Sequence, residues 1–483
     1  MSKKFFVEYF LLSIILVLAV ILRIYKINIP LADHHSWRQS DTAAVARNFI
    51  KERWDFTKPR IDNMTILRPG KPNPERLFLV EPPIYQTIVA GFYKIFGVKE
   101  SYARLVSIIF SLGSMIFLFL LTREFFGSAV GLLAAFFFAV LPYSIFYSRV
   151  VLPEPMMVFL TLGLFYSVNR WLGKEEISWW LISVVFGVVV FTQKSFPLFL
   201  LLPLGYLIFK KYAIHSIKQP KIWLFFSLSL VPIVLWRIWI NQFPEGIPAN
   251  LWLFNQGDIR FKGAFFWWIF AERVSKLILG YWGLPLLVLG LVLKPGQKEG
   301  WFFHWWLVSF LLYVAVFASG NVTHDYYQIP LIPIAAIFLA RGSWWLFNTS
   351  RQVFNKTICY LLFTICILFM LAFSWYQVRD FYNIQGGVDL AGRAVDELTP
   401  KNALVLTGDS NDATLLYNTN RWGWTGGYAS YFPNTSETIE KAKRMGVSIY
   451  VTTKFDTNSE FGQFMLKNYS VLKKTDQYII FTL

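Results

Sequence analysis

A run of residues whose side chains could take part in catalysis or binding begins at Asp33 and reads Asp-His-His-Ser-Trp-Arg-Gln-Ser-Asp. It packs two carboxylates, two imidazoles and one guanidinium into nine residues, directly after a long apolar run. A carboxylate such as Asp33 accepts a proton from a hydroxyl group, and a guanidinium such as Arg38 holds an anionic group. We expect His34 and Asp41 to line the same site. The alternative is a polar loop facing water, in which Asp41 is the N-cap of a helix over residues 42–51.

A second acidic candidate, Glu81, opens the segment Glu-Pro-Pro-Ile-Tyr that ends at Tyr85. Apolar residues at helical spacing follow over residues 86–96, so Glu81 stands at or just before a helix start. An acid there favours the helix dipole, and this structural use competes with a catalytic or metal-binding one. Carboxylate oxygens suit hard divalent cations, so Asp33 and Glu81 are candidate metal ligands. No cofactor is identified with certainty.

Two basic residues lie beside apolar runs, where ionisable groups are costly and by default functional. Arg149 precedes Glu154 by five residues, and the two are either salt-bridge partners or members of a site. Lys194 lies between two apolar runs with no acidic residue nearby in sequence. It therefore either snorkels to the membrane interface or binds an anion.

A last cluster contains His324, Asp325 and Tyr327 in the segment His-Asp-Tyr-Tyr-Gln. An aromatic belt at a membrane interface explains the tyrosines but not the His-Asp pair. We therefore predict that these residues line a cavity. The sequence has no glycine-rich nucleotide loop, no His-Glu-x-x-His and no Cys-x-x-Cys, so it offers no motif for a nucleotide cofactor or a structural zinc.

Long apolar runs must position these residues. Of the 483 residues 55% are hydrophobic and 16% charged, which excludes a single water-soluble domain. A transmembrane helix needs about 20 apolar residues, and this length predicts an α-helical polytopic membrane protein with about eleven spans. They lie near residues 5–22, 102–121, 128–146, 155–172, 177–191, 196–209, 222–240, 274–293, 301–319, 327–347 and 357–376.

Loop charges predict the orientation, because Lys and Arg collect in alternate short loops. The basic loops fit a cytoplasmic N-terminus, with the first run as an uncleaved anchor since no small-residue cleavage site follows it. The long first loop, residues 23–101, then lies outside the cytoplasm. We predict a multi-pass protein of the cell (plasma or inner) membrane.

The chain divides, on this interpretation, into a transmembrane domain over residues 1–376 and a small extracytoplasmic α/β domain over residues 377–483. An odd number of spans places the second domain outside the cytoplasm. Its expected strands and helices alternate in hydrophobic pattern. The strands are expected over residues 402–407, 447–452 and 477–483, and the helices over residues 388–398 and 436–445.

The formal net charge of +17 would suggest nucleic acid as the partner of a soluble protein. Residues 377–483 hold eleven basic and eleven acidic residues, so the whole excess belongs to the membrane part. We interpret it as a topology signal plus a basic first loop. The expected partners are a lipid bilayer and a phosphate-bearing ligand, and no nucleic acid.

Several short motifs on the predicted outer side resemble one family when taken in order. They are an acidic residue opening the long first loop, Pro82-Pro83 and Tyr85 before Arg104, Arg149-x4-Glu154, Thr192-x-Lys194, and His324-x-Tyr-Tyr-x-x-Pro. This order resembles the membrane-embedded GT-C glycosyltransferases of the protein O-mannosyltransferase and aminoarabinose-transferase type. The resemblance covers about residues 5–345.

The resemblance implies transfer of a sugar from a polyprenyl phosphate to a lipid, glycan or protein acceptor outside the cytoplasm. Asp33 falls where the family has its base, and Lys194 where a lysine meets the donor phosphate. Arg149 is expected to assist Lys194. The cavity-lining residues implied by position are His34, Arg38, Asp41, Glu81, Tyr85, Glu154, His324, Asp325 and Tyr327. A single base favours one displacement with inversion at the anomeric carbon.

Other functions use the same residues. A flippase or transporter of an anionic polyprenyl lipid needs the cations but no base. A membrane glycan polymerase or ligase shares the donor class but relies on arginines in a large outer loop. A non-catalytic scaffold uses its α/β domain to bind a partner.

Overall fold

The computed structural model describes residues 3–194, 196–348, 355–409, 412–427 and 432–483. The chain forms two compact units. The first unit comprises Met1–Tyr25, Ser107–Trp236 and Asn250–Asp380. The second comprises Lys26–Val106, Arg237–Ala249 and Phe381–Leu483.

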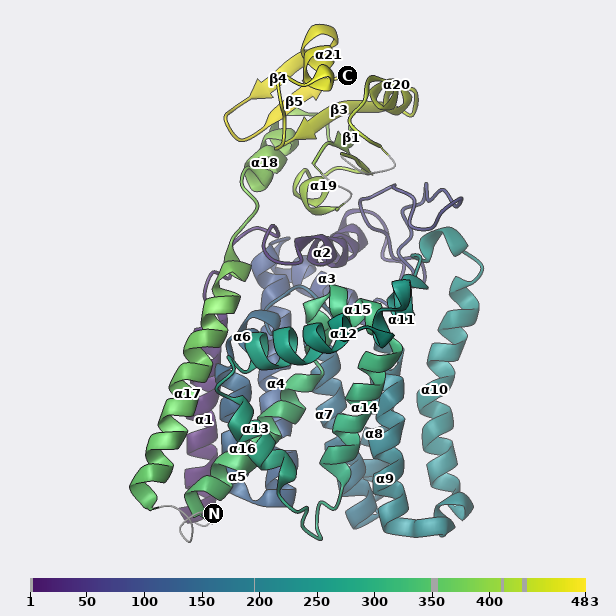
Figure 1. Cartoon of the computed structure of the whole chain (residues 1–483). Coiled ribbons are helices and arrows are strands. Elements are labelled where there is room, and N and C mark those ends of the chain that lie inside the picture. Colours follow the sequence, from purple (N-terminus) through teal and green to yellow (C-terminus); the bar gives the residue numbers. More distant parts are fainter. Residues whose placement is uncertain (1–2, 195, 349–354, 410–411, 428–431) are drawn as a thin grey trace. The chain divides into compact units, whose positions relative to one another are not determined.

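The first unit is helical throughout its described residues (Figure 1). Its longer helices are α1 (Lys3–Arg23), α4 (Glu100–Phe126), α5 (Ser128–Val140), α7 (Glu154–Lys174), α8 (Ile177–Gln193), α9 (Leu201–Tyr212), α10 (Pro220–Ile240), α13 (Leu284–Val292), α14 (Phe302–Val316), α16 (Leu331–Asn348) and α17 (Lys356–Val378). Helices α4 and α10 run across the boundary between the units. Shorter elements are α6 (Pro142–Tyr147), η1 (Phe196–Leu200), η2 (Ala213–Lys218), α11 (Trp252–Asn255), η4 (Gln256–Phe261), α12 (Gly263–Phe266), the π-helix η5 (Trp267–Ile278), α15 (Ala318–Thr323), η6 (Asp325–Gln328) and η8 (Arg379–Tyr382).

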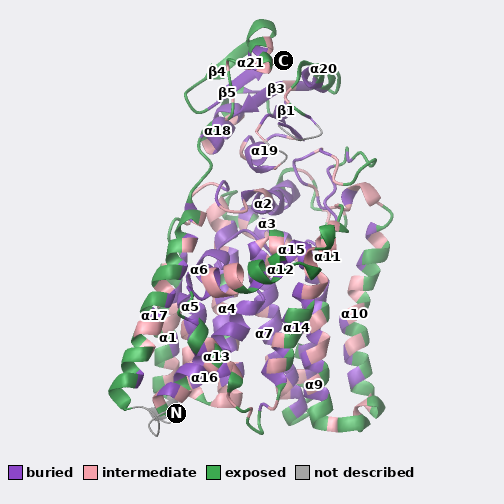
Figure 2. Ribbon diagram, in the orientation of Figure 1, coloured by how far each residue is buried: buried purple, intermediate pink, exposed green. Residues whose placement is uncertain are grey.

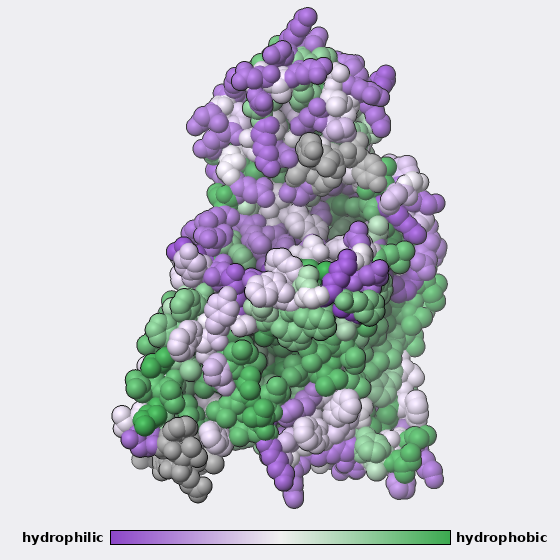
Figure 3. All heavy atoms as spheres, viewed as in Figure 1, coloured by the Kyte–Doolittle hydropathy of each residue, from purple (hydrophilic) through white to green (hydrophobic). Residues whose placement is uncertain are grey.

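Apolar side chains cover the outside of this helical unit, as expected of a membrane protein. Helices α1 and α17 are largely exposed, whereas α16 is mostly buried (Figure 2). The space-filling view shows hydrophobic residues gathered over the helices (Figure 3). Six helices in the described part of the chain are long and apolar enough to cross a membrane, and three more are shorter apolar helices. The chain is therefore a multi-pass membrane protein, while the count of eleven spans stays a prediction.

Every predicted span contains a helix, but several of the predicted spans are interrupted, and two of these breaks have a clear local cause. The expectation of one continuous span over residues 274–293 is wrong, because Gly280 and Tyr281 both have positive φ and end η5 before α13 begins. Pro142 divides residues 128–146 into α5 and α6, since proline supplies no N–H to the carbonyl four residues earlier. The buried guanidinium of Arg23 donates to that carbonyl, on Phe138, at 3.1 Å and to the next one at 2.9 Å. Arg23 thus ties α1 to the broken end of α5.

Helices α13 and α16 approach so closely that glycine is required at the crossing. A Cβ atom at Gly290 would collide with the carbonyl of Phe338, and one at Gly342 with the carbonyl of Leu286. Small residues allow backbones to meet in this way inside a membrane, where apolar burial alone does not favour helix association.

The second unit combines first-loop helices with a mixed sheet. Its helices are α2 (Ser36–Lys51), α3 (Ile84–Phe96), η3 (Pro244–Gly246), α18 (Val388–Leu398), α19 (Thr414–Asn418), α20 (Ser436–Arg444) and α21 (Glu460–Asn468). Its strands are β1 (Leu404–Thr407), β2 (Gly423–Thr425), β3 (Val447–Thr452), β4 (Ser470–Lys474) and β5 (Ile479–Thr482). The strand order is β2-β1-β3-β5-β4, with β2, β1 and β3 parallel and the last two pairings antiparallel.

Side chains alternate across this sheet and form a core on each face. Ile449 and Val451 of β3 pack with residues of α18 and α19, whereas Tyr450 between them packs with residues of α20 and α21. This is the period-two pattern of a strand buried on both faces. The first loop extends the sheet, because the backbone N–H of Met64 donates to the carbonyl of Gly423 at 2.7 Å.

The α/β elements match the sequence prediction in part. Helix α18 and strand β3 have the predicted bounds, and β1, β5 and α20 lie within the predicted ranges. Strands β2 and β4 and helices α19 and α21 were not expected. The division of the chain at residues 376 and 377 stays a prediction.

Candidate functional site

The first-loop polar run folds into α2 and the turn before it. The backbone N–H of Ser36 donates to the carbonyl of Asp33 at 2.9 Å, and His35 has φ 54° at the N-cap. The helix therefore begins at Ser36, and the interpretation of Asp41 as an N-cap is wrong, because Asp41 lies inside the second turn. Its side chain is available for other chemistry.

Asp33 is buried between two partners from its own unit. Its Oδ1 accepts from the Gln39 amide at 2.8 Å, and its Oδ2 lies 3.4 Å from Arg104 Nη2. Arg104 is wholly buried and also donates to the carbonyl of Ile27 at 3.0 Å. It therefore fixes both the carboxylate and the chain leading to it. Neither Gln39 nor Arg104 was predicted to contact Asp33, although a charged residue within an apolar span is a signal that points to the arginine.

Glu81 pairs with Arg38 at 2.7 Å, and both side chains are buried. Both residues were expected to line the cavity, and their pairing with each other was not predicted. Tyr85, at the first turn of α3, is fully buried and donates its hydroxyl to the carbonyl of Ala103 at 3.2 Å. The ring of His34 stacks on Phe381, with ring centroids 3.8 Å apart.

Each of the two candidate metal ligands forms an ion pair with an arginine. Asp33 is engaged by Arg104 and Glu81 by Arg38, so a guanidinium already neutralises each carboxylate. A divalent cation held by these two carboxylates would lie against two positive charges. The pair does not fit such a cation, and no step of the chemistry below uses one.

Asp41 is buried in α2 and has an unusual acidity. Burial raises the pKa of Asp41 to about 7, with the Arg38 guanidinium opposing the rise and the carboxylates of Asp62 and Asp412 adding to it. Asp62 is itself held by an ion pair to the buried Arg47. Asp41 is therefore a carboxyl group that changes protonation near neutral pH.

The first unit gathers a second set of candidates around Lys194. Helices α7 and α8 form an antiparallel hairpin, so the first residue of α7, Glu154, and the residue after α8, Lys194, meet at the same end. The two form an ion pair in which Glu154 is buried and Lys194 is one-fifth exposed. The sequence spacing of 40 residues concealed this partner. The ammonium also lies 5.6 Å from the ring centroid of Tyr326 and 6.0 Å from that of Tyr327.

Asp325 lies at the start of η6, where hydrogen-bond donors from the same unit contact it. The Tyr147 hydroxyl donates to its carboxylate, and the Tyr143 hydroxyl donates to its backbone carbonyl at 2.5 Å. Arg273 of the π-helix lies 3.9 Å from the carboxylate. These three partners were not predicted, and π-helices recur at functional sites.

The remaining candidates also lie in the first unit. Arg149 is fully buried and donates to the carbonyl of Tyr25 at 2.8 Å. The His324 ring lies 5.6 Å from that of Tyr327 and 5.6 Å from that of Trp252. In the first unit, Lys194 therefore pairs with Glu154, and Arg273 lies near Asp325.

Comparison with known proteins connects these features to one class. Residues 80–239 match the family described as dolichyl-phosphate-mannose-protein mannosyltransferase. An uncharacterized protein of Aquifex aeolicus (strain VF5) is 26% identical over 307 residues. That alignment covers 62% of this chain and 59% of the relative, so the chain spans less than two-thirds of the relative's length.

Solved structures agree over more of the chain. ArnT from Cupriavidus metallidurans bound to undecaprenyl phosphate has a TM-score of 0.66 at 12% identity, covering 100% of this chain and 98% of that one. The archaeal oligosaccharyltransferase AglB from Archaeoglobus fulgidus, in complex with an inhibitory peptide and a dolichol-phosphate, has a TM-score of 0.59 at 12% identity, covering 94% and 70%.

The fold is therefore shared with ArnT and with the oligosaccharyltransferase AglB. The matched residues 80–239 are similar to the protein O-mannosyltransferase family, which the order of the sequence motifs also resembles.

Proposed function

We propose that this protein transfers a sugar from a polyprenyl-phosphate donor to an acceptor hydroxyl group on the extracytoplasmic side of the cell membrane. The observation that carries the proposal is the Lys194–Glu154 ion pair with its flanking tyrosines, in a chain whose fold is shared with a protein solved with undecaprenyl phosphate. A partly buried ammonium beside aromatic rings suits a phosphate at the end of an apolar lipid chain.

Asp33 acts in this proposal as the general base. The acceptor oxygen forms a bond to the anomeric carbon while Asp33 takes the hydroxyl proton, and the bond from that carbon to the phosphate oxygen breaks. The electron pair of the broken bond leaves with the polyprenyl phosphate. One displacement of this kind inverts the anomeric configuration, because no second carboxylate serves as nucleophile.

Lys194 and Arg149 stabilise the phosphate charge that develops as the bond breaks. Fixed cations near a developing anion lower the barrier without reorganising solvent, which makes this the largest contribution in many enzymes. Glu154 holds Lys194 in place before the donor arrives. His34, Arg38, Asp41, Glu81, Tyr85, His324, Asp325 and Tyr327 line the donor or acceptor cavity.

The orientation proposed from loop charge places the N-terminus in the cytoplasm and residues 377–483 outside it. The acceptor is a lipid, glycan or protein that presents a hydroxyl group there. The transferred sugar is a hexose or pentose.

The test is transfer of radiolabelled sugar from defined polyprenyl-phosphate donors to cell-envelope acceptors by the full chain in vesicles. Asp33→Asn is expected to bind the donor and lose turnover, whereas Lys194→Ala is expected to lose donor affinity. Asp55→Asn is the matched control, since it changes a partly exposed carboxylate of the same loop.

Near-normal turnover by Asp33→Asn would refute the assignment of the base. Movement of the labelled lipid across the vesicle membrane without bond formation would replace the glycosyltransferase with a transporter.

A further inference from the structure

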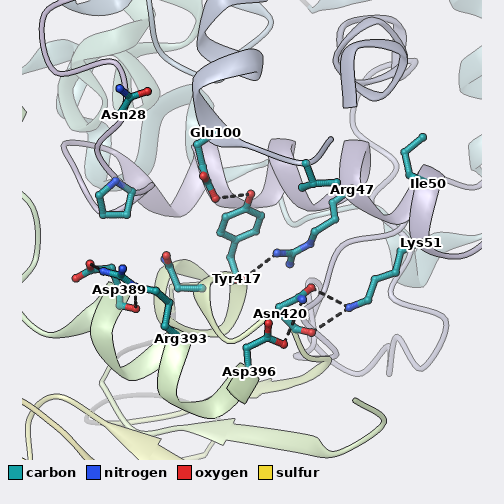
Figure 4. Close-up of a pocket in the computed structure, with 13 residues that line it drawn as sticks. Asn28, Arg47, Ile50, Lys51, Glu100, Asp389, Arg393, Asp396, Tyr417 and Asn420 are labelled. Atoms are coloured by element: carbon teal, nitrogen blue, oxygen red, sulfur yellow. Dashed lines mark hydrogen bonds and ion pairs between the residues drawn. The ribbon is translucent and has the colours of Figure 1, made fainter. Parts of the chain in front are cut away.

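A cavity of about 700 Å³ lies within the second unit, and neither Asp33 nor Glu81 is among the residues that line it. One wall comes from the first loop and the start of α4, and the other from α18, α19 and the residues that follow (Figure 4). Its volume is in the range of small-molecule sites, roughly 300–1,000 Å³. The cavity is therefore large enough for an organic ligand.

The charged residues of this cavity balance one another. Its three cations are Arg47, Lys51 and Arg393, and its three carboxylates are Glu100, Asp389 and Asp396. A lining with no net charge does not select a polyanion such as a phosphate-rich lipid headgroup, nor a polycation. It supplies instead many hydrogen-bond donors and acceptors, to which three asparagines add amide groups of both kinds.

Lys51 and Glu100 retain capacity for a ligand. Lys51 donates to the carbonyl and the side-chain oxygen of Asn420 at 2.9 and 3.0 Å, and within the described ranges no carboxylate lies at ion-pair distance from it. From the part of the chain that the structure describes, Glu100 accepts a single long hydrogen bond, 3.4 Å, from the hydroxyl of Tyr417. In Figure 4 the Tyr417 hydroxyl points toward Glu100, and Lys51 points toward Asn420.

The wall behind these groups is rigid. Arg47 is buried, pairs with Asp62, donates to the carbonyl of Tyr417 at 3.1 Å and stacks over the Tyr417 ring at 4.2 Å. A binding site needs such support to hold its polar groups in place. Pro30, Ile50 and Val98 add apolar surface between the polar groups.

We propose that this cavity binds an uncharged saccharide portion of the acceptor. Each hydroxyl group of a sugar both donates and accepts a hydrogen bond, so a sugar satisfies carboxylates and cations that face one space. The C–H faces of its ring suit the apolar side chains between them. This assignment rests on the proposed glycosyltransferase activity, because it names the class of acceptor as a glycan or glycolipid and makes the cavity a subsite separate from the reacting groups.

The test measures binding of a panel of neutral disaccharides built from mannose, galactose and N-acetylglucosamine to the full chain in lipid nanodiscs, by saturation-transfer NMR with titration. Lys51→Met and Glu100→Gln are each expected to weaken the best disaccharide at least tenfold. Lys467→Met and Glu437→Gln are the matched controls, since both residues are exposed and Glu437, like Glu100, lies in the first turn of a helix. Ile50→Trp fills the cavity without changing its charges, and it is expected to abolish binding.

Binding of undecaprenyl phosphate is measured on the same samples and is expected to change less than twofold, which also shows that the variants are folded. The inference is overturned if no disaccharide binds, if binding survives both Ile50→Trp and Lys51→Met, or if inorganic phosphate or an acidic peptide occupies the cavity in preference to every disaccharide. Disaccharide binding that the variants remove, in a protein that transfers no sugar, supports the cavity and refutes the proposed activity. If the protein transfers sugar but the variants leave the acceptor KM unchanged, the proposed activity is supported and the assignment of the cavity to the acceptor is refuted.

Discussion

The ion pair between Glu154 and Lys194 makes an unusual prediction about donor binding, because the two substitutions should act in opposite directions. Lys194→Met removes the ammonium that is proposed to hold the phosphate. Glu154→Gln removes the carboxylate that already occupies that ammonium. The first variant should bind undecaprenyl phosphate more weakly than the wild type, and the second more tightly.

The magnitudes follow from the burial of the pair. A hydrogen bond to a charged group contributes about 1.5–3 kcal/mol, so Lys194→Met should raise the Kd by roughly 10- to 100-fold. A phosphate on the far side of the ammonium would lie about 5 Å from the Glu154 carboxylate, where repulsion at an effective dielectric of about 20 amounts to about 3 kcal/mol. Because the Lys194 side chain is 20% exposed, solvent reduces this repulsion, and we expect Glu154→Gln to gain about 1–2 kcal/mol, roughly 5- to 30-fold in Kd.

The assay is equilibrium binding of undecaprenyl phosphate to the purified chain in detergent, repeated over a salt series. The control pair is Glu272 and Lys276, which lie one turn apart on η5 at 3.0 Å and are partly exposed. Glu272→Gln and Lys276→Met should each change the Kd less than twofold. If Glu154→Gln weakens binding as much as Lys194→Met does, the pair acts as one structural unit, and the assignment of Lys194 to the phosphate is refuted.

Three further predictions concern the first-loop residues. Asp33→Asn should lower the rate of sugar transfer by roughly 10²- to 10⁴-fold in single-turnover assays while leaving the donor Kd within twofold, and a parallel rise in Kd would contradict its role as base. Arg38→Met should lower the free energy of unfolding by about 3–5 kcal/mol, because it leaves the Glu81 carboxylate buried without its guanidinium. The double variant Arg38→Met/Glu81→Leu should recover most of that loss in thermal unfolding. No recovery would mean that the two residues are not energetically coupled. The pKa of Asp41 is raised to about 7, so the folded state binds a proton more tightly than the unfolded state, and stability should fall by about 4 kcal/mol as the pH rises from about 4 to about 7 and then level off. Asp41→Asn should remove that slope from a series of thermal unfolding curves, and an unchanged slope would assign it to another group.

The membrane helices were predictable because length and apolar composition alone specify a span. The break at Gly280 and Tyr281 was missed, since hydropathy carries no information about φ. The local signal for it is the pair of glycines, Gly280 and Gly283, followed by Pro285. The start of α2 was also missed. It depends on the turn in which Ser36 donates to the carbonyl of Asp33, a local hydrogen bond that competes with the capping tendency of Asp41.

The site was predictable in its members more than in their pairings. Asp33, Glu81 and Lys194 stand out in a sequence because charged groups beside apolar spans are costly. Their partners were hidden, since Arg104 lies 71 residues from Asp33 and Glu154 lies 40 residues from Lys194. Strand β4 escaped prediction for a different reason, because all its residues are exposed and no buried face imposes an alternating pattern.

The short backbone pairing between Met64 and Gly423 has a consequence for biosynthesis. Strand β2 has three residues, and the first loop covers its outer edge through this pairing and through the Thr65–Thr425 hydroxyl contact across 360 residues of sequence. The loop emerges early during translation, whereas the edge it covers emerges about 360 residues later. Completion of this unit must therefore be a late, slow event, because the entropy cost of closing so long a loop is met before the stabilising contacts form. Until then the uncovered strand edge is open to pairing with other chains, and this interval is where assembly of the protein is most exposed to aggregation.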